Sequence, residues 1–215
     1  MNAAPALPAY QNTPGLSCDA EHVYRIGSEV LLGVSEVLHE NRLVDDRFFD
    51  EESRSRGTAV HAALELYANG IPRELLTTFG DLDENLWGWF KSGADFIDGL
   101  RAAGHEIAGV ELRLAHDQYR YAGTVDLVTR RSAEIFVWDF KTGGAAKVTR
   151  LQLGAYGMFL MKGAYTPRKA AVELREDGSR AVLREYNALD HFYDGATFLA
   201  LLTATRTRRR FGAKS

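Results

Sequence analysis

The sequence predicts an α/β domain with a central mixed β-sheet, which includes an antiparallel meander and is flanked by helices. Three observations predict this fold class. Apolar residues first recur at helical spacing, short runs rich in Val, Ile, Tyr and Phe follow, and helical spacing then returns before the C-terminus. The chain has 215 residues, of which 46% are hydrophobic and 26% charged, so a disordered or fibrous protein is excluded.

The chain is expected to form a single domain over residues 35–205. We find no internal repeat, low-complexity tract or Pro/Ser-rich linker that would divide it. Residues 206–215 are predicted to be a basic tail. Residues 1–34 are predicted to be an irregular N-terminal arm, because breaking residues interrupt its first half: Pro5, Pro8, Pro14 and Gly15.

The predicted helices span residues 35–40, 57–68, 83–102, 152–161 and 188–209. Ser35 is expected to be an N-cap, Gly70 and Pro72 stop the second helix, and the acidic stretch 45–55 before it is expected to be a loop or a frayed helix. The apolar residues expected to face the core are Val60, Leu64, Tyr67, Leu86, Trp89, Phe90, Phe96, Ile97, Leu100, Phe192, Phe198, Leu199 and Leu202.

The predicted strands form two groups. Residues 107–115, 119–130 and 135–141 are rich in β-branched and aromatic residues and are separated by polar turns, which is typical of a three-strand meander. A second hairpin is expected where 169–176 and 180–186 flank Asp177-Gly178, since Asp-Gly favours a tight turn.

Several classes of site and location are excluded or disfavoured. Cys18 is the only cysteine, so an internal disulfide, a four-cysteine zinc site and a four-cysteine iron–sulfur cluster are excluded. The N-terminus lacks the basic start and apolar core of a signal peptide, and the longest apolar run, 153–161, is too short to cross a bilayer. We therefore expect a cytoplasmic protein without a membrane partner.

The most informative stretch runs from Gly123 to Gly143 and predicts a pair of facing carboxylates. If the hairpin turn is centred between Ser132 and Ala133, Asp126 lies directly opposite Asp139, with Cβ atoms about 4.5–5.5 Å apart. Lys141 shares that face and Phe140 points to the other one, because side chains alternate along a strand.

Two opposed carboxylates destabilise a sheet unless something positive lies between them. A divalent cation, a lysine or a shared proton each meets this need, and hard oxygen ligands with open water positions suit Mg²⁺ or Mn²⁺. The alternative is a surface ion network in which the two acids pair with Lys141 and nearby arginines.

Two further acids and a histidine are candidates near this pair. His61 and Glu65 are four residues apart on the first long helix, so both can point at the edge of a sheet packed there. Taken alone, His61 is more typical of a core or capping histidine than of a metal ligand, and it is the acid pair that favours metal coordination. Glu111 is expected opposite Gly123 if the first hairpin turns around Asp117, and the alternative is an exposed strand glutamate.

The segments after the second acid carry polar groups suited to a phosphate. Gln152 and Tyr156 are four residues apart and can hydrogen-bond a phosphate or orient Lys141, or they can complete the helix terminus. The segment Thr142-Gly143-Gly144 lets the chain leave the strand tightly, and its backbone amides can approach an anion.

The last ten residues are basic, although the whole chain has a net charge of −3. They are either a phosphate contact or a solvated helix end, where cations complement the helix macrodipole. The basic residues are Arg206, Arg208, Arg209, Arg210 and Lys214.

Taken in order, these residues resemble the PD-(D/E)XK nuclease superfamily, and most closely its RecB-like branch, which includes bacteriophage-type exonucleases. The resemblance covers roughly residues 35–160 and implies a restriction-endonuclease-like core. Val125 replaces the proline of the superfamily name, and the cysteines that hold an iron–sulfur cluster in some relatives are absent, so no cluster is implied. The matching series is Gly57-x-x-x-His61-x-x-x-Glu65, Glu111, Gly123-x-x-Asp126, Asp139-Phe140-Lys141 and Gln152-x-x-x-Tyr156.

The resemblance implies a Mg²⁺ or Mn²⁺ site. His61, Asp126 and Asp139 would be metal ligands, and the carbonyl of Phe140 would complete the set. Glu111 would hold a second metal or its waters.

The resemblance also implies how DNA is bound and cleaved. Lys141 would orient or deprotonate the attacking water and offset charge in the transition state. Gln152 and Tyr156 would position the DNA strand and the lysine, and Arg208 and Arg209 are the tail residues expected to bind substrate.

The sequence therefore predicts a Mg²⁺- or Mn²⁺-dependent deoxyribonuclease of bacterial or phage-infected cytoplasm. The exonuclease form is favoured, with a role in DNA recombination, repair or phage DNA processing. DNA is the expected partner, and a homo-oligomer or a recombination partner protein stays open. The alternatives are a nuclease-fold protein that binds nucleic acid or protein without cleaving, and a structural ion network in a domain of unrelated function. All named catalytic positions hold competent residues, which disfavours the silent form.

Overall fold

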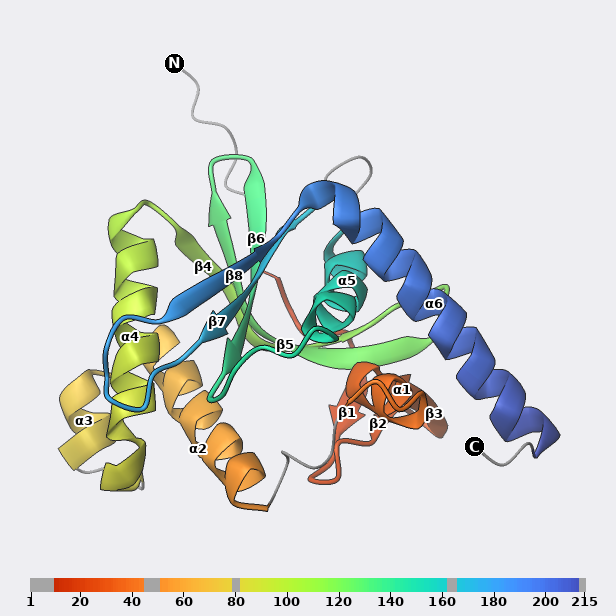
Figure 1. The fold of residues 1–215 in the computed structure, drawn as a ribbon, viewed down its shortest axis with the longest axis horizontal. Helices are drawn as coiled ribbons and strands as arrows, with labels where there is room; N and C mark the ends of the chain where they lie inside the picture. The colour runs from red at the N-terminus through yellow and green to blue at the C-terminus, as the bar shows by residue number, and fades with distance from the viewer. Residues whose placement is uncertain (1–9, 45–50, 79–81, 162–165, 213–215) are drawn as a thin grey trace.

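The computed structural model describes residues 10–44, 51–78, 82–161 and 166–212. It has an eight-stranded mixed sheet with helices on both sides (Figure 1). The strands are β1 (Leu16–Cys18), β2 (Tyr24–Ile26), β3 (Glu29–Gly33), β4 (Glu106–Ala115), β5 (Tyr121–Arg131), β6 (Glu134–Lys141), β7 (Arg168–Glu173) and β8 (Val182–Tyr186). The helices are α1 (Val34–Glu40), α2 (Glu51–Ala68), α3 (Arg73–Thr78), the 3₁₀ turn η2 (Glu84–Leu86), α4 (Trp87–Ala102), α5 (Thr149–Leu160) and α6 (Ala188–Phe211).

The predicted α/β fold class and the meander β4–β5–β6 are confirmed. The path through the sheet is β1-β2-β3-β5-β6-β7-β8, and β4 pairs with β5 outside this path. The pairs β3–β5 and β6–β7 are parallel and the others antiparallel. The expected second hairpin is β7–β8, and its turn contains Gly178 at a positive φ of 72°.

Strand β5 is at the centre of the sheet, and the sheet forks along one edge of this strand. Strand β4 occupies one edge of β5, and the other edge pairs first with β3, at Tyr121 and Ala122, and then with β6, from Leu127 onward. Between these two stretches β3 and β6 diverge. Asp126 lies at this fork, where main-chain pairing gives way to side chains.

Two apolar layers cover the faces of the sheet. On one side, α2 and α4 bury residues such as Leu64 and Ile97 against Trp138. On the other, α1, α5 and α6 bury residues such as Leu153 and Phe198 against β5 and β6. The expected stripes of the helices are confirmed at these positions. Phe192 is the exception: it is 74% exposed on the first turns of α6, so its expected place in the core was wrong.

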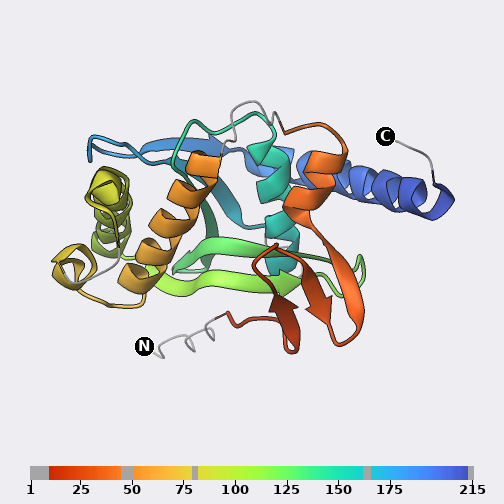
Figure 2. The ribbon, with the colours of Figure 1, turned by 90° about the horizontal axis from the view of Figure 1, so that it is seen from below.

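Residues 16–33 form three short strands, which corrects the expected irregular arm over 1–34. The β2–β3 hairpin turns through Gly27, whose φ is +59°, and buries Tyr24 and Leu31 against Ala122 of β5. Residues 1–9 lie outside the described part of the chain. Figure 2 shows these strands at the end of the molecule opposite α3 and α4.

Three helix boundaries differ from the expected ones. The N-cap of α1 is Gly33 instead of Ser35, and the Gly33 amide donates to Glu36 Oε2 at 2.9 Å. Helix α2 already begins at Glu51, within the stretch expected to be a loop or a frayed helix; residues 45–50 are not described. Helix α6 continues through Phe211, so residues 206–211 are helical and form no separate tail.

No helix within the described ranges is both long enough and apolar enough to cross a membrane.

Candidate metal-dependent nuclease site

The β5–β6 hairpin has the register that the sequence predicts. Arg131 pairs with Glu134 across the turn, and the ladder runs back to Leu127 and Trp138. The next position on each strand holds Asp126 and Asp139. At this position the Asp126 carboxylate accepts the hydrogen bond in place of a main-chain carbonyl: the Phe140 amide donates to Asp126 Oδ2 at 2.7 Å.

Glu111 lies opposite Asp126, and its expected position opposite Gly123 was wrong. The pairs on either side of it are Val110 with Leu127 and Leu112 with Val125. The β4–β5 hairpin therefore turns later than Asp117, at a loop closed by hydrogen bonds between His116 and Tyr121 and between Arg120 and His116. This shift of register brings a second carboxylate to the fork.

Both strands are irregular at this point. Residues two apart on a regular strand share a face, yet Val110 packs on the side of α2 and α4 while Leu112 packs on the other side. The paired strand shows the same change of face between Val125 and Leu127. Glu111 has a φ of +45°, a left-handed conformation that costs a non-glycine residue about 1–2 kcal/mol. Local strain therefore accompanies the placement of its carboxylate.

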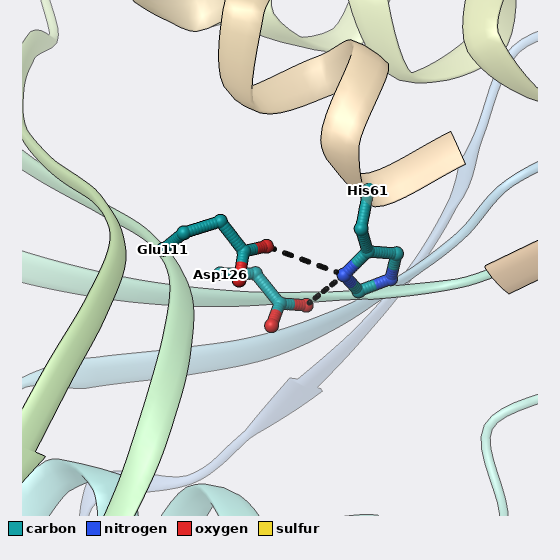
Figure 3. A group of neighbouring side chains, drawn as sticks. All are labelled: His61, Glu111 and Asp126. Carbon is teal, nitrogen blue, oxygen red and sulfur yellow. Dashed lines mark ion pairs between the residues drawn. The ribbon is translucent and has the colours of Figure 1, made fainter. Parts of the chain in front are cut away.

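His61 of α2 meets the two carboxylates from the helical side (Figure 3). Its Nδ1 lies 3.4 Å from Glu111 Oε1 and 3.6 Å from Asp126 Oδ2, and its Nε2 lies 3.1 Å from the Phe140 carbonyl oxygen. We call His61, Glu111 and Asp126 the donor cluster. One ligand atom from each of the three lies within 4.8 Å of the other two.

The electrostatics of the donor cluster favour a positive charge. Burial alone would lower the pKa of His61, but the charges of Asp126 and Glu111 outweigh it and raise that pKa to about 9. Burial also raises the pKa of Asp126, with Glu111 acting in the same direction. The buried carboxylate of Asp126 and the half-buried one of Glu111 thus share one imidazole, and any cation that enters lowers the cost of keeping both ionised.

Asp139 and Lys141 lie beside the donor cluster and face α5. Lys141 Nζ lies 2.8 Å from Asp139 Oδ2. Burial raises the pKa of Asp139 to about 6, against the opposing charge of Lys141. Apart from this ion pair, the buried Oδ2 accepts no hydrogen bond from the part of the chain that the structure describes.

Helix α5 supports the lysine through a short relay. Lys141 Nζ donates to Gln152 Oε1 at 3.2 Å, and Gln152 Nε2 donates to the Tyr156 hydroxyl at 3.0 Å. Tyr156 is buried against Gly123, where a Cβ atom would lie 2.8 Å from its ring. Glycine at this position of β5 therefore leaves the space that Tyr156 occupies.

Two groups of candidates lie apart from these residues. The side chain of Glu65, one turn beyond His61, makes no hydrogen bond or ion pair within the described ranges. At the end of α6, Arg209 pairs with Glu36 and Glu40 of α1 and Arg208 donates to an asparagine next to that helix. The expected substrate contacts of these two arginines stay a prediction.

Sequence reasoning passed over two arginines of α2 near the site. Arg56 and Arg54 line separate cavities, and the cavity at Arg54 is also lined by Gly123 and Tyr156. The signal available was their place five and seven residues before His61: Arg54 lies within the acidic stretch 45–55, expected to be a loop or a frayed helix, and Arg56 directly follows it.

The comparison with protein families agrees with this geometry. The sequence model of the PD-(D/E)XK nuclease superfamily matches residues 36–207, which is most of the chain. The chain belongs to the PD-(D/E)XK nuclease superfamily. No curated protein matches it.

Members of this superfamily use divalent metal ions, and the donor cluster fits one. It offers one imidazole nitrogen and two carboxylates, with the Phe140 carbonyl next to them. Mn²⁺ accepts all of these ligand types, and Mg²⁺ accepts the oxygen ligands among them. Asp139, expected as a third ligand, pairs with Lys141 in this structure, and the expectation that it binds the metal stays a prediction; Glu111 is the second carboxylate grouped with His61 and Asp126. Superfamily membership also implies nucleic-acid binding.

Proposed function

We propose that the protein is a Mg²⁺- or Mn²⁺-dependent deoxyribonuclease that hydrolyses phosphodiester bonds. The observation that supports this most is the donor cluster with Lys141 beside it, at the fork of β5. Hydrolysis of a phosphodiester needs a Lewis acid, a positioned water and a cation near the developing charge. Residues suited to each of these tasks lie around one point.

His61, Glu111 and Asp126 would hold the metal ion, and Asp139 would join them or hold the metal's waters. A bound divalent ion would polarise the phosphate and make a water molecule more acidic.

Lys141 would hold the attacking water and offset negative charge in the transition state. An ammonium group has three N–H donors, and Asp139 and Gln152 engage two of them within the described ranges, so one donor is left for a water molecule. Gln152 and Tyr156 would set the position of that ammonium group and of the strand to be cleaved.

The exonuclease form is favoured by the resemblance of the motif series to the RecB-like branch, with a role in DNA recombination, repair or phage DNA processing. A silent, binding-only protein is the alternative. The presence of a histidine, three carboxylates and a lysine that are all competent argues against it, since a protein that only binds DNA gains nothing from burying two facing acids.

A digestion assay tests the proposal. Closed circular, linear duplex and single-stranded DNA would be incubated with the protein in Mn²⁺, in Mg²⁺ and in EDTA, and an Asp126→Asn preparation would control for contaminating nuclease. We expect metal-dependent digestion of linear DNA and survival of the closed circle. Cleavage of the circle would contradict the exonuclease form. No digestion in either metal would contradict the enzyme and support the binding protein.

A further inference from the structure

A cavity of about 580 Å³ opens directly beyond the catalytic lysine. Arg56 of α2 and Trp89 of α4 form one part of its wall, and the segment Thr142-Gly143-Gly144, which follows Lys141, forms another. Residues 173–177, at the end of β7 and in the turn after it, close the far side. Because this segment directly follows Lys141 in the chain, the cavity lies next to the proposed site of cleavage.

Arg56 enters this cavity with most of its hydrogen-bonding capacity unused. Among the residues that the structure describes, its side chain makes one hydrogen bond, from Nη2 to Ser53 Oγ at 3.2 Å, and its buried Nε has no acceptor. The guanidinium carbon lies 5.0 Å from the centre of the Trp89 ring, so an aromatic face holds it. Within the described ranges no carboxylate pairs with it. Arg73 of α3, by contrast, pairs with two aspartates.

The opposite wall carries neutral donors without partners. The Thr142 hydroxyl and the amides of Gly143 and Gly144 make no hydrogen bond to other residues that the structure describes. A Cβ atom on either glycine would meet nothing within 4 Å, so the backbone here is open to an approaching ligand. At Gly57, next to Arg56, a Cβ would lie 3.9 Å from Thr142 Oγ1, which places the two walls side by side.

The far side of the cavity is acidic and limits what can enter. Glu173 accepts a hydrogen bond from Ala145 and pairs with Arg184, and Asp177 accepts one from Ser179. Glu176 adds a third carboxylate to the lining. Arg56 and the neutral donors at the near side match one anionic group, whereas a second group at the far side would face these three carboxylates and one cation, Arg175.

We propose that this cavity binds a single phosphate group of the nucleic-acid strand, next to the phosphodiester cleaved beside Lys141. Arg56 supplies the charge, and Thr142 with the two glycine amides supplies neutral donors, a combination that suits phosphate oxygens. The inference rests on the proposed function, since it names how that site holds its substrate. The phosphate is either an internal linkage or a terminal group.

The test measures binding without cleavage. Affinity for a short fluorescent duplex would be measured in EDTA at low salt, with a neutral methylphosphonate placed at one linkage at a time near each end, and with or without a terminal phosphate. In the wild type, one substitution or the loss of the terminal phosphate should weaken binding about tenfold, the scale of a charge-assisted contact. The sensitive position distinguishes an internal from a terminal phosphate.

The matched variants are Arg56→Gln and Arg54→Gln, which lose the same charge two residues apart on α2. The tenfold penalty should fall below about twofold in Arg56→Gln and persist in Arg54→Gln. Thr142→Val, which leaves α2 intact, should reduce the penalty too, and thermal unfolding would confirm that each variant is folded. An equal penalty in Arg56→Gln and wild type, no penalty at any position, or no binding of the duplex would overturn the proposal. Because no cleavage is needed, a positive result alongside a failed digestion assay would retain the cavity and reject the nuclease.

Discussion

The ammonium group of Lys141 is held by a buried carboxylate and a side-chain amide, Asp139 at 2.8 Å and Gln152 at 3.2 Å. Within the described ranges, this ammonium group forms no ion pair with a residue of the donor cluster. Removing it should therefore affect the transition state more than the ground state.

We expect Lys141→Ala to lower the rate of cleavage by about 10²–10³-fold, the scale of losing one electrostatic contact to a transition state. Mn²⁺ affinity should stay within a few-fold of wild type, as measured by calorimetry. Lys147→Ala, which removes an exposed lysine six residues along the chain, serves as the control. Full activity in Lys141→Ala would refute the role assigned to this residue.

A fully buried lysine outside the candidate site affects the folding stability of the protein. Lys169 of β7 is 3% exposed, and its Nζ lies 3.8 Å from Asp194 Oδ2. Neither atom forms a hydrogen bond within the described ranges. Burial lowers the pKa of Lys169 to about 8, and Asp194 opposes this only in part. The folded protein therefore releases this proton more readily than the unfolded chain, whose lysines have a pKa of about 10.4.

Between about pH 8 and 10.4 the unfolded chain binds more protons at this site, so folding stability contributed by Lys169 rises with pH. Relative to Lys169→Met, the wild type should gain about 1–3 kcal/mol between pH 7 and pH 10, as measured by urea unfolding. Since other groups titrate equally in both proteins, the comparison isolates Lys169. A difference in stability that does not change with pH would show that the lysine keeps its ordinary pKa.

At the scale of elements, the basic end of α6 lies against α1. Arg209 pairs with Glu36 and Glu40, and Arg206 donates to the carbonyl oxygens of Tyr119 and Arg120. The pair with α1 is exposed, so it adds at most about 1 kcal/mol to stability. Arg209 and its neighbour Arg208, which donates to Asn41, are the arginines expected to bind substrate.

The double variant Arg208→Ala/Arg209→Ala tests this expectation. If both arginines contact phosphates, the slope of log affinity for DNA against log salt should decrease by roughly one to two units. The melting temperature should change little. A slope equal to that of wild type would assign these arginines to the contact with α1 alone.

The hairpins show which parts of the fold the sequence can predict. The β5–β6 register was predicted correctly, because apolar runs on both strands leave one polar minimum, at Ser132 and Ala133. The β4–β5 register was not, because the turn is longer than expected and Glu111 adopts a positive φ that no local pattern reveals. Only the pairing in three dimensions shows that Glu111 lies opposite Asp126.

The sequence could not predict the shortest strands, or which strands pair in parallel, for another reason. Strands β1 and β2 have three residues each, which is too few to show a period of two. The parallel pairing of β3 with β5 joins residues almost 90 positions apart and depends on packing of the whole domain. The cavity at Arg56 has the same origin, since its walls come from α2, α4, the segment after β6 and the end of β7 with the turn that follows it.

At the scale of the whole molecule, the site lies where the two helical layers meet the sheet. His61 comes from α2 on one face, Gln152 and Tyr156 come from α5 on the other, and the acids come from the strands between them. At this point one edge of β5 pairs with neither β3 nor β6. Residues from both layers therefore reach a common position only in the folded domain.

The most direct test of this account is a calorimetric titration with Mn²⁺, in the absence of DNA, of the wild type and two variants. Asp126→Asn removes a carboxylate of the donor cluster, and Glu65→Gln removes one from the same helix as His61 but outside the cluster. We predict that wild type and Glu65→Gln bind Mn²⁺ equally and that Asp126→Asn binds it at least about tenfold more weakly. No binding by the wild type, or equal binding by Asp126→Asn, would contradict the claim that these donors hold a metal ion.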